Sequence, residues 1–367
     1  MLFIYILSIL LISVYSFSRI VLFGALMYFG FSLIFFTAYS MKHSALLLIL
    51  LSIVSTAPAQ TPKSAGEYID RGNALRHQGD FDRAILDYTK AIEIDEATLR
   101  TAKPGEVTEE LAGAYLNRAL ARDEKGDYDG AISDLDRAIQ IRPQYADAYN
   151  QRGIARKKEG DLNGAIADYN KAIEINPQFT KAYINRGNVR DQRGDSDGAL
   201  ADYNKALELD PSDAFAFTNR CNVRAKKNDP DGAMSDCNKA LDLAPRFAEG
   251  YIIRGNVRSD KGDFHGAVAD YNKALEINPK FEKAYLQRGL VRVDMNDISG
   301  AVADFNQAII INPRYAEAYG LKGIAELMQG KDAEAEQDFK KCFGLNPSLK
   351  PGLLQLVNRI KQRRKPH

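Results

Sequence analysis

Apolar and small residues recur along most of this chain in one pattern with a period of about 34 residues. The stretch from residue 146 to residue 179 shows the pattern most clearly, as two segments that Gly160 and Asp161 separate. Large, small and chain-breaking residues stand at fixed places in it: Tyr149, Gly153, Ala165, Tyr169, Ala172 and Pro177. The pattern predicts a hairpin of two antiparallel helices.

The spacing has a physical explanation. Gly153 on the first helix carries no side chain, so the ring of Tyr169 on the second helix can lie against its backbone. Gly160 tolerates the positive φ that ends a helix, and Asp161 can accept a hydrogen bond from the free amides that begin the next one. Pro177 stops the second helix.

Eight copies of the pattern lie between residues 65 and 349, and we call them units one to eight. They begin at Ala65, Ala112, Ala146, Thr180, Ala214, Ala248, Glu282 and Ala316. The order of aromatic, glycine, alanine and proline positions resembles the tetratricopeptide repeat family. The resemblance implies an all-α fold, a right-handed α-solenoid of helix-turn-helix repeats.

Two regions depart from the strict register. Unit one has Glu96 where the others have proline, so its second helix is not forced to stop, and an insertion follows at residues 99–111. Thr108 to Glu110 can open the next helix early. At the other end, residues 350–367 predict a C-terminal capping helix with Leu353, Leu356 and Val357 on one face, followed by a basic tail.

Arginine pairs spaced i, i+4 recur on the first helix of units two to seven, and one aspartate recurs on each second helix. The arginines offer two readings: a ladder of arginine–carboxylate bonds between helices, which we favour, or an anion-binding surface. The pairs are Arg118 and Arg122, Arg152 and Arg156, Arg186 and Arg190, Arg220 and Arg224, Arg254 and Arg258, Arg288 and Arg292; the acids are Asp134, Asp168, Asp202, Asp236, Asp270 and Asp304.

The N-terminal sixty residues differ from the repeats. Residues 1–40 are almost wholly apolar, with Arg19 as the one charged side chain, and they are long enough for a short membrane hairpin. From Met41 a second pattern begins, with a positive start, an apolar core and Ala57-Pro58-Ala59 before Gln60, which is typical of a secretory signal peptide. We favour translation from Met41, which would make residues 1–40 an over-extended reading frame.

Both readings place the repeats outside the cytoplasm or on a membrane. A signal of residues 41–59 that is cleaved after Ala59 gives a periplasmic or secreted protein, and an uncleaved segment gives a membrane-anchored one. A bacterial periplasm fits the cleaved form. Contact with the membrane is then expected only through the N-terminal segment.

Composition argues against several classes of protein. The formal net charge is +1, so a general nucleic-acid binder with a basic stripe is not expected. Three cysteines and four scattered histidines give no metal-ligand spacing. Phosphate-loop, dinucleotide and metalloprotease motifs are absent from the sequence. We therefore expect no catalytic residues, no cofactor and no metal.

The resemblance implies a concave groove lined by the first helix of each unit. Amides dominate its expected positions: Asn73, Asn117, Gln151, Asn185, Asn188, Asn219, Asn222, Asn256 and Gln287. Each amide offers a donor and an acceptor, so these rows can bond the backbone of an extended peptide, or they can satisfy neighbouring polar groups. The resemblance thus implies a non-enzymatic scaffold that binds a protein or peptide segment. An envelope-assembly or chaperone-like subunit that docks a fixed partner remains the alternative.

Unit five breaks the rule that pairs a glycine with a ring. Cys221 replaces the glycine and Cys237 replaces the aromatic residue. Because these positions are neighbours in the other units, the two sulfurs face each other. We favour a disulfide in an oxidising compartment over a pair of buried free thiols, and we expect Cys342 to be reduced and buried.

Overall fold

The computed structural model describes residue 62, residues 64–99 and residues 108–364. The predicted membrane hairpin, the signal-like segment and most of the insertion therefore lie outside the described residues. Ser64 onward forms one compact unit by its internal contacts. The described residues fold into α-helices and one short 3-10 turn, which confirms the all-α repeat superhelix.

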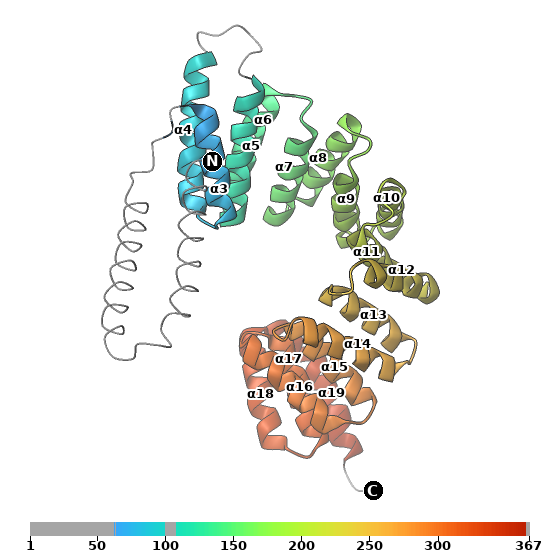
Figure 1. The fold of residues 1–367 in the computed structure, drawn as a ribbon. Helices are drawn as coiled ribbons and strands as arrows, with labels where there is room; N and C mark the ends of the chain where they lie inside the picture. Colours follow the sequence, from blue (N-terminus) through green and yellow to red (C-terminus); the bar gives the residue numbers. More distant parts are fainter. Residues whose placement is uncertain (1–61, 63, 100–107, 365–367) are drawn as a thin grey trace, which may run out of the picture. The chain divides into compact units, whose positions relative to one another are not determined.

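Eight helical hairpins follow one another in chain order (Figure 1). The first helices are α3 (Ala65–His77), α5 (Thr108–Lys125), α7 (Ala146–Glu159), α9 (Thr180–Gln192), α11 (Ala214–Lys226), α13 (Ala248–Asp260), α15 (Glu282–Asp294) and α17 (Ala316–Met328). The second helices are α4 (Phe81–Leu99), α6 (Tyr128–Ile141), α8 (Leu162–Ile175), α10 (Ser196–Leu209), α12 (Pro230–Leu243), α14 (Phe264–Ile277), α16 (Ile298–Ile311) and α18 (Asp332–Leu345). The 3-10 turn η1 (Pro347–Leu349) and α19 (Lys350–Arg363) complete the order.

The turn inside most hairpins has the predicted chemistry. Asn228 and Asn296 replace the glycine in units five and seven, and Lys331 replaces the capping aspartate in unit eight. In unit three, Gly160 ends α7 in the left-handed region with φ of 99°. Asp161 then caps α8, because its carboxylate accepts a hydrogen bond from the amide of Gly164 at 2.9 Å. The helix ends at Ile175, two residues before Pro177. Local sequence therefore sets where α7 ends and where α8 begins and ends.

The close approach of the two helices depends on the glycine on the first. A Cβ added to Gly153 would lie 2.6 Å from the ring of Tyr169, which is fully buried. The same contact joins Gly187 to Tyr203 and Gly289 to Phe305. A larger residue on the first helix would push the hairpin apart, so the glycine–ring pair fixes its width.

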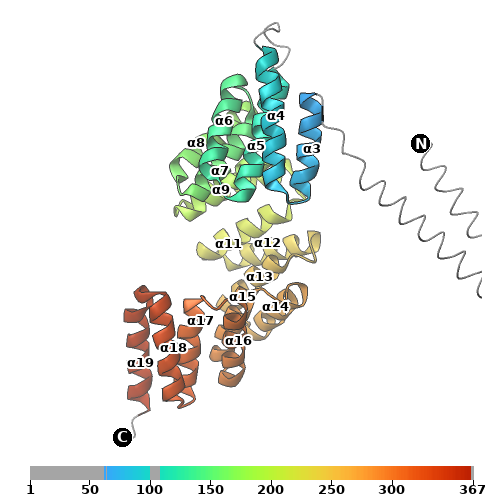
Figure 2. The same ribbon diagram turned by 90° about the vertical axis from the view of Figure 1, so that its left-hand side faces the viewer.

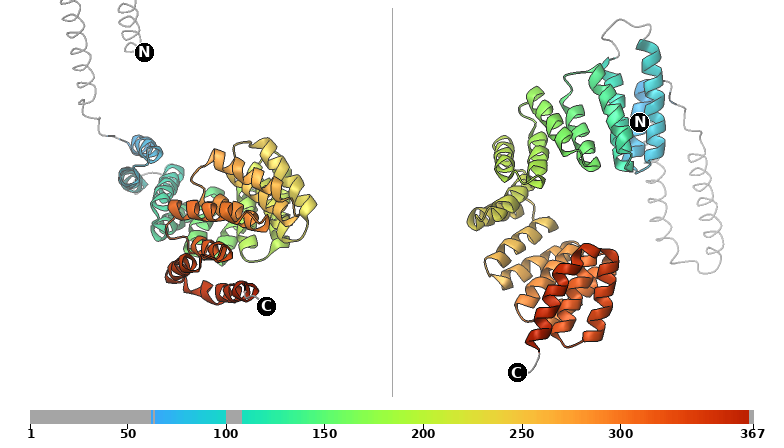
Figure 3. Two further views of the ribbon diagram at one scale, coloured as in Figure 1. Left: turned by 90° about the horizontal axis from the view of Figure 1, so that it is seen from below. Right: turned by 180° about the vertical axis from the view of Figure 1, so that it is seen from behind.

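Consecutive units pack through neighbouring helices, as the turned views show (Figures 2 and 3). Each second helix contacts the first helix of the next unit, and the first helices of consecutive units also contact one another. Consecutive second helices lack a comparable contact in the described part of the chain. The first helices are therefore on the inner side of the curve. We call the surface they share the inner face.

Both ends of the array depart from the repeat. The helix α4 continues to Leu99, as expected from Glu96 in place of proline, and α5 begins early at Thr108. The helix α19 covers unit eight with Leu353 and Val357. Leu356, expected on the same face, is 40% exposed, so that placement was wrong. Within the described residues, no helix combines the length and hydropathy needed to cross a membrane.

Candidate functional site

The arginines predicted to form a ladder do so. In unit four, Arg186 donates two hydrogen bonds to Asp202, of 2.6 and 3.0 Å, and Arg190 donates one of 2.9 Å to the same carboxylate. Asp202 is only 2% exposed. Each of units two to seven repeats this arrangement. The buried carboxylate is thus neutralised within its own unit, and the reading of an anion-binding surface is not supported.

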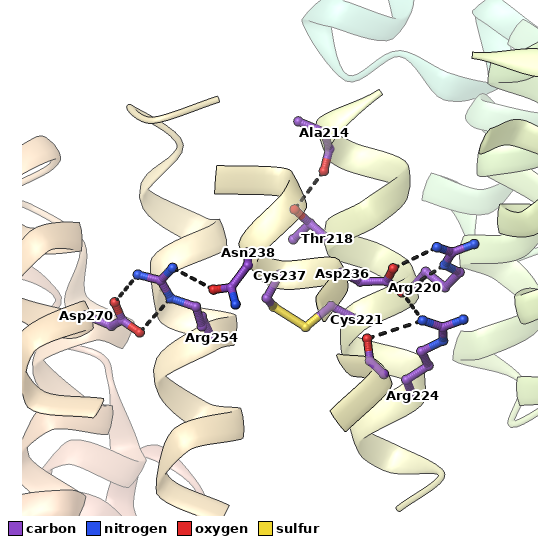
Figure 4. Close-up of a disulfide and its surroundings, with 11 residues drawn as sticks. Ala214, Thr218, Arg220, Cys221, Arg224, Asp236, Cys237, Asn238, Arg254 and Asp270 are labelled. Carbon is purple, nitrogen blue, oxygen red and sulfur yellow. Dashed lines mark hydrogen bonds and ion pairs between the residues drawn. A yellow bond between two sulfur atoms is a disulfide. The ribbon is translucent and has the colours of Figure 1, made fainter. Parts of the chain in front are cut away.

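The ladder also joins units, which the sequence analysis missed. The remaining nitrogen of Arg186 donates to Asn170 on the second helix of the preceding unit at 2.6 Å. Equivalent bonds run from Arg220 to Asn204 and from Arg254 to Asn238. Figure 4 shows the second of them. The signal was an asparagine directly after the ring position of the second helix, a position that Cys237 occupies in unit five. Unit one also takes part, through Arg71 and Asp87.

A shallow polar hollow lies between α5 and α6, and two of the three arginines that line it belong to the ladder, whereas Arg137 donates to Gln140. Arg118 and Arg122 line it together with Asp134. Both guanidinium groups already donate to that carboxylate. No charge in this part of the hollow is therefore left to bind an anion.

Predicted groove amides meet at the contacts between first helices. Asn185 on α9 donates to Asn150 on α7 at 2.9 Å, and Asn219 on α11 donates to Asn188 on α9 at 3.0 Å. These bonds cross from one unit to the next, so this register of the first helices lies on the inner face. Asn150 was not predicted, and it is buried.

A second set of predicted amides is held by tyrosines of the same unit. Asn73, Asn188 and Asn256 accept hydrogen bonds from the hydroxyls of their ring partners at 2.7–2.8 Å. Each amide then keeps its NH2 group for another acceptor. The interpretation that these amides satisfy neighbouring polar groups therefore holds for their oxygens. Their NH2 groups remain without a described acceptor.

The other predicted amides have no such partner. Asn117, Gln151, Asn222 and Gln287 are half-buried and make no hydrogen bond with another described side chain. In unit three, Ile154 replaces the asparagine that would receive the tyrosine hydroxyl, so the buried hydroxyl of Tyr169 has no partner among the described residues. The inner face thus combines fixed and free amide groups.

The two cysteines of unit five are brought together. Cys221 on α11 and Cys237 on α12 have α-carbons 5.5 Å apart, and their sulfurs lie 2.08 Å apart as a disulfide (Figure 4). Both residues are fully buried. Cys342 is free and buried in unit eight. The disulfide occupies the place of the glycine–ring contact that units one, three, four, six, seven and eight have.

Two buried carboxyls lie outside the ladder pattern. Burial raises the pKa of Asp95 on α4 to about 6, and the nearby carboxyl of Glu110 contributes in the same direction. In unit eight, burial raises the pKa of Glu326, and Asp338 raises it further. Among the described residues, no group of three or more metal-binding side chains occurs. Neither carboxyl is therefore placed beside a nucleophile or a metal set.

Comparison with known families decides the assignment. A tetratricopeptide repeat model matches residues 65–97, 146–179 and 180–213, a second such model matches residues 286–343, and a TPR repeat model matches residues 120–160 and 255–295. Together these matches cover more than half of the chain. The chain belongs to the tetratricopeptide repeat family. Members of this family bind protein or peptide partners and are typically non-catalytic interaction scaffolds. Among the curated proteins, none matches this chain.

Solved structures agree on the fold of this tetratricopeptide repeat protein. A tetratricopeptide repeat protein from Parabacteroides merdae is 21% identical, with a TM-score of 0.57 over 67% of this chain and 98% of that one. The Cut9–Hcn1 hetero-tetramer of the APC/C is 15% identical, with a TM-score of 0.59 over 80% and 58%. Yeast Tom70 is 20% identical, with a TM-score of 0.54 over 84% and 66%. At these identities the likeness shows the fold alone.

Proposed function

We propose that the inner face of this tetratricopeptide repeat protein binds an extended protein segment through its amide side chains. The observation that carries the proposal is one register of asparagines in three consecutive units, Asn188, Asn222 and Asn256. Each has an NH2 group without a described acceptor, and carbonyl groups of an extended backbone are the natural acceptors.

The surrounding charges support a ligand that is recognised mainly by its backbone. The arginine pairs of units two to seven form ion pairs with buried aspartates, so they add no unpaired charge to the inner face. Several inner-face charges also pair across units, as Lys226 does with Asp191 at 2.7 Å. Neutral donors and acceptors therefore dominate the centre of this surface.

The test uses the full chain in detergent and a displayed library of random twelve-residue peptides. Peptides selected on the unsubstituted protein are measured against the triple variant Asn188→Ala, Asn222→Ala and Asn256→Ala. Loss of three hydrogen bonds worth about 1 kcal/mol each should weaken binding at least tenfold. Circular dichroism should show unchanged helix content.

A matched triple variant gives the control. Glu174→Ala, Glu208→Ala and Glu276→Ala remove three exposed side chains from the second helices, each paired only with a lysine one turn away. This variant should bind like the unsubstituted protein. Equal affinity of the asparagine variant would remove the amides from the binding surface, and failure to select any peptide would contradict the proposal itself.

We also propose that the repeats work outside the cytoplasm. The signal-like sequence of residues 41–59 supports this, and so does a cysteine pair suited to an oxidising compartment. Amino-terminal sequencing of the natural protein should return Gln60. An intact Met1, or membrane association that survives high salt, would contradict cleavage.

A further inference from the structure

Unit five departs from the other units on its inner face. Its second position is Phe215, and the ring is 62% exposed. The neighbouring units carry a charge at the same position: Asp147, Lys181, Glu249, Lys283 and Glu317. An aromatic ring left in water at one place in a repeating surface marks a contact point for another molecule.

The ring is held in position by a second aromatic residue. Phe247, which precedes the first helix of unit six, meets Phe215 edge to face with ring centroids 4.8 Å apart. The contact lies where α11 packs on α13. The two rings thus form one rim of the inner face, and one side of Phe215 stays open to a ligand.

The same unit has an amide that the disulfide leaves free. In units one, four and six, a tyrosine hydroxyl holds the oxygen of the asparagine at this register. In unit five Cys237 stands in the tyrosine's place and has no hydroxyl, so both the oxygen and the NH2 group of Asn222 are available. Asn222 lies seven residues after Phe215, on the same face of α11.

The charges on either side of Phe215 are also unpaired. Lys181 in unit four and Glu249 in unit six occupy the same register and are exposed. Neither makes an ion pair within the described part of the chain. A positive group, an aromatic ring and a negative group therefore follow one another along three consecutive first helices.

We propose that units four to six form an anchor site for an extended segment with a large apolar residue between an acidic and a basic residue. Packed helices are about 8–10 Å apart, and an extended chain of the polyproline II type advances about 3.1 Å per residue with three residues per turn, so a charge about three residues from the apolar residue lies on the same face of the segment. The apolar side chain packs on Phe215, its backbone bonds Asn222, and the charges meet Lys181 and Glu249. This inference rests on the proposed function, since it names the kind of segment that the inner face selects.

The probe is a fluorescein-labelled peptide that contains Glu-Gly-Ser-Phe-Ser-Gly-Lys, with its anisotropy measured against the full chain in detergent. We expect binding to weaken at least tenfold when alanine replaces the peptide's phenylalanine, and when both of its charges are made lysine or both glutamate. These controls hold for either direction of the peptide along the array.

Substitutions in the protein provide the reciprocal test. Phe215→Ala should weaken binding of the probe at least tenfold. Ile310→Ala, which removes an equally exposed apolar side chain from a second helix, should leave that binding unchanged. The double exchange Lys181→Glu and Glu249→Lys should leave affinity for this probe nearly unchanged, because the charged probe can reverse its direction. The single change Lys181→Glu should weaken it.

The outcomes separate the two proposals. If library peptides depend on the asparagine register but the probe does not bind, or binds equally to Phe215→Ala, the anchor site is wrong and the proposed function stands. If the single and double charge variants behave alike, the assigned charge pattern is wrong. If neither library nor probe binds, both proposals fail.

Discussion

Arg186 binds Asp202 through two hydrogen bonds, of 2.6 and 3.0 Å, between the two helices of unit four. The same guanidinium donates to Asn170 in unit three. One side chain therefore sets both the closure of its own hairpin and its register on the preceding unit. Because the carboxylate is buried, these bonds replace its hydration.

Removal of that carboxylate should be costly. Asp202→Ala would leave Arg186 and Arg190 partly buried without their counter-ion, so the free energy of unfolding should fall by about 3 kcal/mol. Urea unfolding followed by circular dichroism measures the change. Asp197→Ala is the control, since it removes an exposed carboxylate paired with Lys227 and should cost about 0–1 kcal/mol. Equal costs would mean that the ladder contributes no more than a surface ion pair.

Two buried tyrosines should respond differently to loss of the hydroxyl. Tyr203→Phe removes the donor that Asn188 accepts, and should destabilise the protein by about 1 kcal/mol. Tyr169→Phe removes a buried hydroxyl without a described partner, and should leave stability unchanged or raise it by about 1 kcal/mol. The two variants have the same chemistry and differ only in the residue opposite, Asn188 or Ile154. Thermal unfolding of both decides the point, and a loss at Tyr169 as large as that at Tyr203 would contradict it.

The cysteine pair should be oxidised in the natural protein. Alkylation after denaturation without reductant should label only Cys342, and mass spectrometry should find Cys221 and Cys237 in one linked peptide pair. Three alkylated thiols would disprove the bond. Because the bond closes a loop of 16 residues, reduction should lower the free energy of unfolding by on the order of 3 kcal/mol. The double variant Cys221→Ala and Cys237→Ala should show no response to reductant.

Asp95 should make stability depend on pH. Its folded-state pKa of about 6 lies above the ordinary value of 3.8, so the unfolded chain releases the proton first and stability falls as pH rises from about 4 to about 6. Asp95→Asn should therefore stabilise the protein at pH 7 by about 1–2 kcal/mol and have little effect below pH 4. Urea midpoints measured across this range test the prediction. Glu93→Gln, an exposed change on the same helix, should leave the pH profile unaltered; a profile for Asp95→Asn that also matches the unsubstituted protein would refute the assignment.

Residue spacing determined most of the fold. Gly160 and Asp161 define a turn, Gly153 and Tyr169 a contact, and Arg186 and Asp202 an ion pair, each within a single unit of about 34 residues. Such contacts are local, so the helical period fixes which side chains face each other. The continuation of α4 past Glu96, where the other units have a proline that stops the helix, follows from the same local rule.

The tertiary structure decided what happens between units. The bond from Arg254 to Asn238, the bond from Asn219 to Asn188 and the exposure of Phe215 depend on how one hairpin is rotated against the next. That rotation results from the packing of many side chains from two units, and no spacing in the sequence encodes it directly. The sequence determined the unit and its internal contacts, whereas packing between units decided which amides are occupied and which remain free on the inner face.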